Sequence, residues 1–215
     1  MRVLWTVIAL GAAVALVAVA AGCGSSSGAT NATAPIQGPP SLGQLPAGLR
    51  DTPAPRVRLR ALSGGGGASA KPFDTAALRG RPYFVTFLYV HCTTTCPLIG
   101  EELRETLHRL GPQARRVAVV AVSVQPERDT AAAVHAWLKL HHEPANFHYV
   151  IGTRAELAPV WKTWFASPQP GGNGPSIHTA AVWVVDAKGR RVAEVPAGAA
   201  IDPGELAAEA RTLLS

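Results

Sequence analysis

Cysteine is scarce in this chain, with three residues among 215, at positions 23, 92 and 96. Even with one histidine, the close pair Cys92 and Cys96 supplies too few ligands for a closed structural zinc site, which needs four. Lysine and arginine outnumber aspartate and glutamate, which gives a net charge of +6. The basic residues are spread through the chain in ones and twos, without a long basic block. Because such a block is what tracks a phosphate backbone, we expect no nucleic-acid partner.

The first 22 residues predict a lipoprotein signal peptide. Arg2 is followed by an uncharged run rich in Ala, Val and Leu, which ends in Ala20-Ala21-Gly22-Cys23 and resembles a bacterial lipobox. The resemblance implies cleavage before Cys23 and lipid attachment to its sulfur. The alternative is an uncleaved membrane anchor, because the run is nearly long enough to span a bilayer. Either way, we expect a domain on the extracytoplasmic face of the cell membrane.

Residues 23–55 are dominated by Gly, Ser, Ala, Thr and Pro, which predicts a flexible tether. We expect the folded domain to begin near Arg56 and to cover residues 56–215. Assigning Cys23 to the lipid leaves an even pair of cysteines in that domain. In an oxidising compartment a close pair tends to form a disulfide unless a reductase or a metal holds it.

Strand and helix patterns alternate beyond the tether. The apolar run 83–90 is apolar on both sides, which is typical of a central strand with both faces covered. Further strands are predicted at 57–62, 117–124, 147–151 and 178–185, and helices at 98–110, 129–142, 153–165 and from Asp202. The alternation predicts an α/β domain with a mainly parallel sheet between helices and an antiparallel hairpin over 186–195 at one edge.

Cys92 and Cys96 lie where strand 83–90 gives way to a helix. With Cys92 in the loop and Cys96 in the first helical turn, both sulfurs face the helix N-terminus, which favours thiolates and lowers both pKa values. His178 opens a later strand, and it reaches the cysteines if that strand runs antiparallel to theirs. Two soft thiolates and an imidazole suit copper. The same thiols could also cycle as a disulfide.

Several motifs in order resemble the Sco/SenC family over residues from about Arg56 to the carboxyl terminus. They are Cys92-x-x-x-Cys96-Pro97 after an apolar strand, Val122-Ser-Val-Gln-Pro-Glu-Arg-Asp-Thr130, Ile151-Gly-Thr-Arg154, and His178-Thr-Ala-Ala-Val-Trp-Val-Val-Asp186 with Gly189. The resemblance implies a thioredoxin-like fold with a central mixed sheet flanked by helices. It also implies copper binding by Cys92, Cys96 and His178. By their chemistry, two thiolates hold Cu(I), and the imidazole helps to accommodate Cu(II).

Family members deliver copper to the binuclear copper site of cytochrome c oxidase, or reduce the cysteines there. The resemblance therefore implies, as partners, the copper-bearing oxidase subunit or another cuproprotein, together with a copper donor protein. The chain departs from the family pattern at Thr93–Thr95, where proline and an acidic residue are usual, and at Gln125, where aspartate is usual. His91 is a further departure, and the sequence leaves open whether it is a fourth donor or a polar neighbour.

Three alternatives use the same residues differently. A thiol-disulfide oxidoreductase would attack with Cys92, which should be more exposed than Cys96, although the three-residue spacer differs from that of common thioredoxin-like reductants. A thiol peroxidase would use one cysteine against peroxide and resolve with the other. In the third alternative the pair is a stabilising disulfide and His178 an ordinary residue at a strand end.

Overall fold

The computed structural model describes residues 42–43, 45, 48–168, 178–196 and 201–215. The predicted signal peptide, Cys23 and the predicted tether up to residue 41 lie outside these ranges, as does the stretch 169–177 that precedes His178. One compact unit runs from Gln37 to Ser215. Within the described ranges no helix combines the length and apolar character needed to cross a bilayer.

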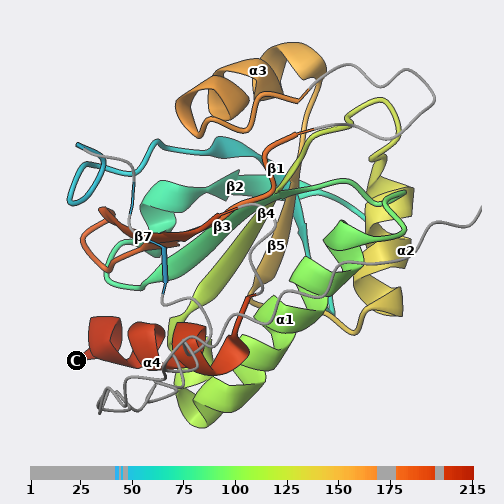
Figure 1. Ribbon diagram of the computed structural model, residues 1–215. Coiled ribbons are helices and arrows are strands. Elements are labelled where there is room, and N and C mark those ends of the chain that lie inside the picture. Colours follow the sequence, from blue (N-terminus) through green and yellow to red (C-terminus); the bar gives the residue numbers. More distant parts are fainter. Residues whose placement is uncertain (1–41, 44, 46–47, 169–177, 197–200) are drawn as a thin grey trace, which may run out of the picture. The chain divides into compact units, whose positions relative to one another are not determined.

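A seven-stranded mixed sheet forms the centre of this unit, in the order β2-β1-β5-β4-β3-β6-β7 (Figure 1). Strands β3, β4 and β5 run parallel, while β1, β2, β6 and β7 pair antiparallel with their neighbours. The predicted mixed sheet is therefore confirmed, but the expectation that it is mainly parallel is wrong, because four of the six strand pairings are antiparallel. The strand bounds are β1 Arg58–Ser63, β2 Lys71–Asp74, β3 Tyr83–Leu88, β4 Ala118–Ser123, β5 Phe147–Ile151, β6 Val182–Val185 and β7 Arg191–Val195.

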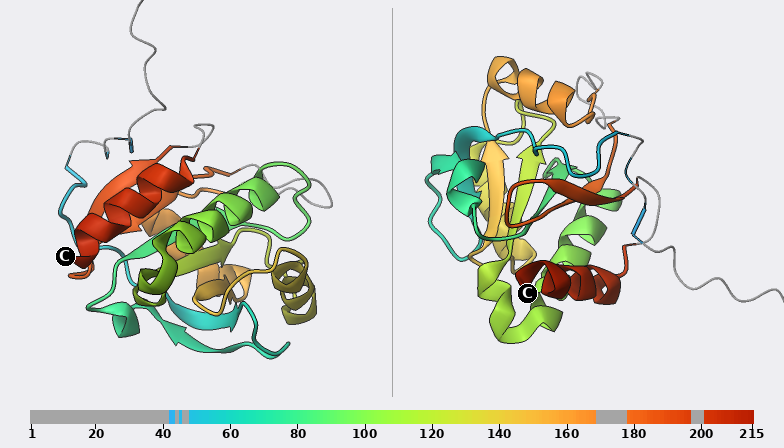
Figure 2. Two further views of the ribbon diagram at one scale, coloured as in Figure 1. Left: turned by 90° about the horizontal axis from the view of Figure 1, so that it is seen from below. Right: turned by 90° about the vertical axis from the view of Figure 1, so that its left-hand side faces the viewer.

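Helices cover both faces of the sheet. Helices α1 and α4 lie together on one face and α3 lies on the other (Figures 1 and 2). Trp137 of α2 packs against Phe147 and Tyr149 of β5. The bounds are α1 Thr95–Leu110, α2 Ala131–Leu140, α3 Arg154–Thr163 and α4 Pro203–Leu214, with short 3-10 turns η1 Thr75–Leu78 and η2 Gly111–Arg116.

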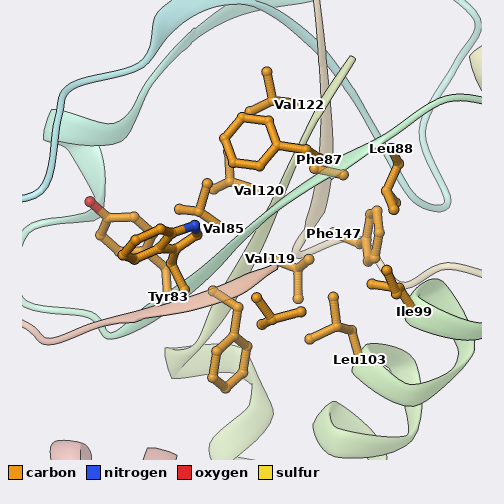
Figure 3. Packing of buried hydrophobic residues seen from close by; sticks show 14 of the residues in the cluster. Tyr83, Val85, Phe87, Leu88, Ile99, Leu103, Val119, Val120, Val122 and Phe147 are labelled. Atoms are coloured by element: carbon orange, nitrogen blue, oxygen red, sulfur yellow. The ribbon is translucent and has the colours of Figure 1, made fainter. Parts of the chain in front are cut away.

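The centre of the core is the pair β3 and β4, in which every residue is buried. Figure 3 shows Val85 and Phe87 on one side of the strands, and Leu88 on the side of α1 together with Ile99 and Leu103. Each such side chain contributes roughly 1.5–3 kcal/mol when fully buried. The apolar run therefore fixes β3 on both faces, and with it the starting point of the cysteine loop.

The folded region begins earlier than predicted. We expected it to start near Arg56, but residues 51–54 already run beside β7 and the turn before it. Asp51 N–H donates to Arg191 O, Arg191 N–H to Thr52 O, and Ala54 N–H to Gly189 O, at 2.8 to 3.0 Å. These bonds use backbone groups, so the polar composition of the segment gave no sign of them.

One other boundary differs from the prediction and one agrees with it. Strand β6 begins at Val182 rather than at His178, so the histidine lies on an extended approach to the strand. Helix α2 was expected to begin at Asp129-Thr130, and Thr130 is its N-cap, with a hydroxyl that accepts from Ala133 N–H. The Asp129 side chain points into the protein interior, where it is 2% exposed.

Candidate metal centre

The cysteine loop joins the buried end of β3 to the first turn of α1. Cys92 N–H donates to Tyr89 O at 3.2 Å, which closes a tight turn after the strand. Thr94 is the N-cap residue of α1, and Cys96 is the second residue of the helix. Pro97 follows at a position where the missing N–H leaves no helical hydrogen bond unmade. The predicted placement of Cys92 in the loop and Cys96 in the first turn is therefore confirmed.

The Cys92 sulfur caps this helix. Thr94 makes no side-chain capping bond, and Cys96 N–H donates instead to Cys92 Sγ at 3.3 Å. The hydroxyl oxygen of Thr94 lies 3.9 Å from the same sulfur. Both cysteines are free thiols, with Cys92 8% and Cys96 2% exposed. Cys92 is thus the more accessible of the two, as predicted.

The two thiols differ in acidity. Burial alone would raise the pKa of Cys92, but hydrogen bonds from Cys96 and Thr94 outweigh it and lower that pKa to about 7. For Cys96 burial dominates, and the neighbouring Cys92 and Asp129 add to it, so its pKa lies well above the ordinary value. The expectation that both pKa values fall is wrong for Cys96, because the helix places that sulfur inside the core.

Asp129 anchors the loop to the sheet. Its carboxylate accepts from Val90 N–H at 3.0 Å, from the Ser123 hydroxyl at 2.6 Å and from the Tyr149 hydroxyl at 3.1 Å. Burial raises the pKa of Asp129 to about 6. The motif that contains Gln125 and Asp129 therefore ties the cysteine loop to β4 and β5.

His178 approaches from the neighbouring strand. β6 runs antiparallel to β3 with Val85 opposite Trp183, and the same register continued to position 178 brings the histidine level with the start of the cysteine loop. The rings of His178 and Tyr89 meet edge to face, 6.2 Å between centroids. The antiparallel arrangement predicted for this strand is confirmed.

The histidine presents a donor nitrogen. Nδ1 lies 3.1 Å from Thr179 O, and because a carbonyl only accepts, the proton of the bond is on Nδ1. In the neutral ring the lone pair is then on Nε2, which is free to bind a metal. Burial lowers the pKa of His178 and so favours the neutral form.

The structure brings the two thiols together and places the His178 ring against the ring of Tyr89. Within the described ranges, no group of three His, Cys, Asp or Glu side chains is close enough to hold a metal ion. His91 is exposed, whereas Cys92 beside it is buried. Tyr89, which sequence reasoning missed because it continues an apolar run, is the residue that touches both parts of the site.

The sequence profile of the SCO1/SenC family matches residues 67–215. The chain belongs to the SCO1/SenC family. No curated protein matches it by sequence. Among solved structures, the copper-bound ScoI of Bradyrhizobium japonicum is 28% identical, with a TM-score of 0.61, over 75% of this chain and 100% of that one. The thioredoxin-like fold predicted for this SCO1/SenC protein is confirmed by such neighbours.

Two more distant SCO1/SenC structures share the fold. A SCO1/SenC family lipoprotein from Bacillus anthracis is 18% identical with a TM-score of 0.64, over 77% of this chain and 96% of that one. BsSco is a member of the Sco family of cytochrome c oxidase assembly proteins, and a disulfide switch has been identified in it. It is 17% identical with a TM-score of 0.58, over 74% of this chain and 92% of that one. The SCO1/SenC family thus includes copper-binding proteins of cytochrome oxidase assembly.

Proposed function

We propose that this protein is a membrane-tethered, extracytoplasmic copper chaperone that carries Cu(I) on Cys92, Cys96 and His178 to the copper site of cytochrome c oxidase. The observation that carries the proposal is the paired arrangement of Cys92 and Cys96 at the start of α1, in which the Cys92 sulfur accepts a hydrogen bond from Cys96 N–H and is the more exposed of the two. Soft thiolates hold Cu(I), and an imidazole completes a low-coordinate site that a recipient's ligands can enter.

Copper is the cargo of this site, and the chain's own residues prepare it. Cys92 offers a sulfur that is already stabilised as a thiolate, while Cys96 gives up its proton when the metal binds. His178 offers Nε2, and its ring contacts that of Tyr89, which also contacts Cys92. We expect His178 to complete the ligand set on metal binding, which requires it to approach the two sulfurs.

The test is Cu(I) competition against a chromophoric chelator, with the reduced fragment 37–215. This fragment contains the whole described core. The solved ScoI structure, whose entire length matches 75% of this chain, shows that a domain of that size folds alone. We expect one tight equivalent, lost in Cys92→Ser and Cys96→Ser and weakened in His178→Ala. His108→Ala, which removes an exposed histidine of α1, is the matched control and should change nothing. Binding no tighter than that of stray histidines would contradict the chaperone function.

A second candidate is a thiol-disulfide oxidoreductase that reduces the recipient's cysteines. It is favoured by the unequal exposure of the two thiols, which is the arrangement of an attacking and a resolving thiol. The Cys92 thiolate attacks a partner disulfide and forms a mixed disulfide, releasing one partner thiolate. Cys96, on losing its proton, then attacks Cys92 Sγ, which releases the second partner thiol and leaves the pair oxidised by two electrons.

The two functions separate in the His178→Ala protein. A reductase needs only the thiols, so this variant should still reduce a disulfide-bonded peptide that contains the cysteine pair of an oxidase copper site. A chaperone without His178 should bind Cu(I) more weakly. Retention of full Cu(I) affinity by His178→Ala would remove the histidine from the proposed ligand set.

A further inference from the structure

A basic pocket lies at the end of β3 opposite to the cysteines. It is a cavity of about 250 Å³, and four of its lining side chains are cationic: Arg56, Arg79, Lys188 and Arg190. Tyr83, the first residue of β3, also lines this cavity. Cys92 lies beyond the other end of the strand, four residues after Leu88. The strand between spans about 17 Å at 3.3 Å per residue. We call this cavity the basic pocket.

The basic pocket keeps an excess of positive charge. Arg56 pairs with Asp74, and the Arg190 guanidinium donates to Asp51 O. Arg79 and Lys188 are exposed, and no side-chain hydrogen bond or ion pair involves either of them in the part of the chain that the structure describes. Two of the four cations are thus available to an incoming anion.

One more carboxylate lies beside the pocket. The Asp186 side chain accepts from the backbone N–H groups of Lys188 and Arg190, at 2.9 and 2.7 Å. This carboxylate is engaged by the turn between β6 and β7 and does not neutralise the lysine or arginine side chains by direct contact. Arginines and a lysine around one cavity are the groups that bind phosphate oxygens in proteins.

The size of the cavity restricts the ligand. Pockets for drug-sized molecules measure roughly 300–1,000 Å³, so a cavity of about 250 Å³ suits a small group rather than an organic cofactor. A single phosphate with its nearest substituents is such a group. The chemistry therefore points to a phosphate-bearing anion, which could come from solution or from a lipid headgroup.

The N-terminal segment first meets the domain at Gly43, which bridges to Glu194 of β7, and then passes along this pocket. Pro53 and Ala54 line the cavity, and Cys23 stands 30 residues before Pro53 in the sequence. Cys23 and Gly43 are 20 residues apart in the sequence, and a random chain of 20 residues spans roughly 25 Å. A lipid on Cys23 would therefore keep the basic pocket within reach of the headgroups, at a high effective concentration.

We propose that the basic pocket binds the phosphate of an anionic phospholipid headgroup in the membrane that anchors the chain. The choice of a lipid headgroup as the source of the phosphate depends on the proposed lipid tether. The presence of a cationic cavity does not depend on it. Binding there would orient the domain, because the cysteines at the other end of β3 would then face away from the bilayer.

The test uses fragment 37–215, which carries no lipid, in flotation assays with phosphatidylcholine vesicles containing 30% phosphatidylglycerol and with pure phosphatidylcholine vesicles. Arg79→Ser/Lys188→Ser removes the two available cations. The matched control, Arg115→Ser/Lys162→Ser, removes one arginine and one lysine from exposed sites on η2 and α3. Both double variants lower the net charge by two, so a difference between them reports the position of the charges.

We expect the fragment to bind the anionic vesicles and not the neutral ones. The pocket variant should lose about 30-fold in affinity, since each cation near an anionic surface contributes about fivefold. The control should lose no more than about twofold. An equal loss in both variants would show unspecific attraction by net charge and would overturn the proposal.

Inorganic phosphate separates the two sources of the anion. If 10 mM phosphate shifts the amide signals of the pocket while the vesicles retain no protein, the ligand is a free anion and the headgroup proposal fails. Absence of both effects would also overturn it, and would leave an acidic protein face as the partner to examine. Cu(I) affinity, measured on the same preparations, should be unchanged in the pocket variant, so failure of this proposal and failure of the chaperone function can be told apart.

Discussion

Cys92 and Cys96 should differ in the pH at which each reacts with an alkylating agent. Hydrogen bonds from Cys96 and Thr94 outweigh burial and bring the pKa of Cys92 to about 7, against an ordinary value of 9.0, while burial keeps Cys96 protonated. At pH 5 about 1% of Cys92 is thiolate, and at pH 7 about half. Its alkylation rate should therefore rise about 50-fold between these pH values and only about twofold above pH 7.

The absolute rate follows from two opposing effects. A thiol of ordinary pKa is about 1% thiolate at pH 7, so Cys92 has about 50 times more of the reactive form. A thiolate of lower pKa is also a weaker nucleophile, by about eightfold for this decrease at a Brønsted coefficient of about 0.45. The net advantage at pH 7 is about sixfold before steric access is considered, and access does not change the shape of the pH profile.

The assay is iodoacetamide alkylation of the reduced, metal-free fragment 37–215 between pH 5 and 10, with the two sites followed by peptide mass spectrometry. Thr94→Ala removes one hydrogen bond to the Cys92 sulfur and should move the midpoint to higher pH, while Thr93→Ala is the matched control. A Cys92 rate that still rises tenfold per pH unit above pH 8 would refute the reasoning. So would faster alkylation of Cys96 than of Cys92.

Three further predictions concern the support of the site. Burial raises the pKa of Glu143 to about 8, so the native state keeps a proton that the unfolded chain loses above pH 4.5. The free energy of unfolding therefore falls as pH rises from 4.5 to 8. In urea unfolding at pH 7, Glu143→Gln should recover up to about 3 kcal/mol of that loss. Gly100→Ala places a Cβ 2.8 Å from Trp137 Cη2 and should destabilise the fragment by about 1–3 kcal/mol, which exceeds the gain of about 1 kcal/mol in helix propensity. Asp129→Asn weakens the bond to Val90 N–H and should cost about 3 kcal/mol in the same assay and reduce Cu(I) affinity, because the turn before Cys92 loosens.

Each of these predictions has a control. The effect of Glu143→Gln should nearly vanish at pH 3.5, where the carboxyl is about nine-tenths protonated in the unfolded chain and fully protonated in the native state, and an effect independent of pH would contradict the assignment. Gly67→Ala, at a glycine with no atom near the added Cβ, should leave stability within about 0.5 kcal/mol. For Asp129→Asn, an unchanged Cu(I) affinity alongside lower stability would limit Asp129 to a role in folding.

The buried strand and the cysteine pair could be predicted because their signals are local. Eight consecutive residues from Tyr83 are mostly apolar, and the change to helical spacing after Cys96 marks the start of α1. The antiparallel direction of β6 followed from one geometric requirement, that His178 and the cysteines meet at the same end of the sheet. The structure confirms both.

Other features depend on contacts between distant segments and could not be read from local patterns. The sequence placed Asp129 at the start of a helix, and its role in holding the cysteine loop could not be predicted because its partners Val90 and Tyr149 are 39 and 20 residues away in sequence. The high pKa of Cys96 follows from how deeply the helix sets that sulfur, which spacing does not report. The pairing of residues 51–54 with β7 joins segments 139 residues apart through backbone groups, so side-chain composition cannot reveal it.

The order of strands in the sheet has a consequence for timing. Cys92 lies in the loop after the third strand and Cys96 in the helix that follows, whereas His178 leads into the sixth strand, 82 residues beyond Cys96. A chain synthesised from its amino terminus therefore exposes both thiols before the histidine exists. The proposed three-ligand copper site can therefore be completed only after β6 has paired with β3, and until then only the two thiols are available to a metal.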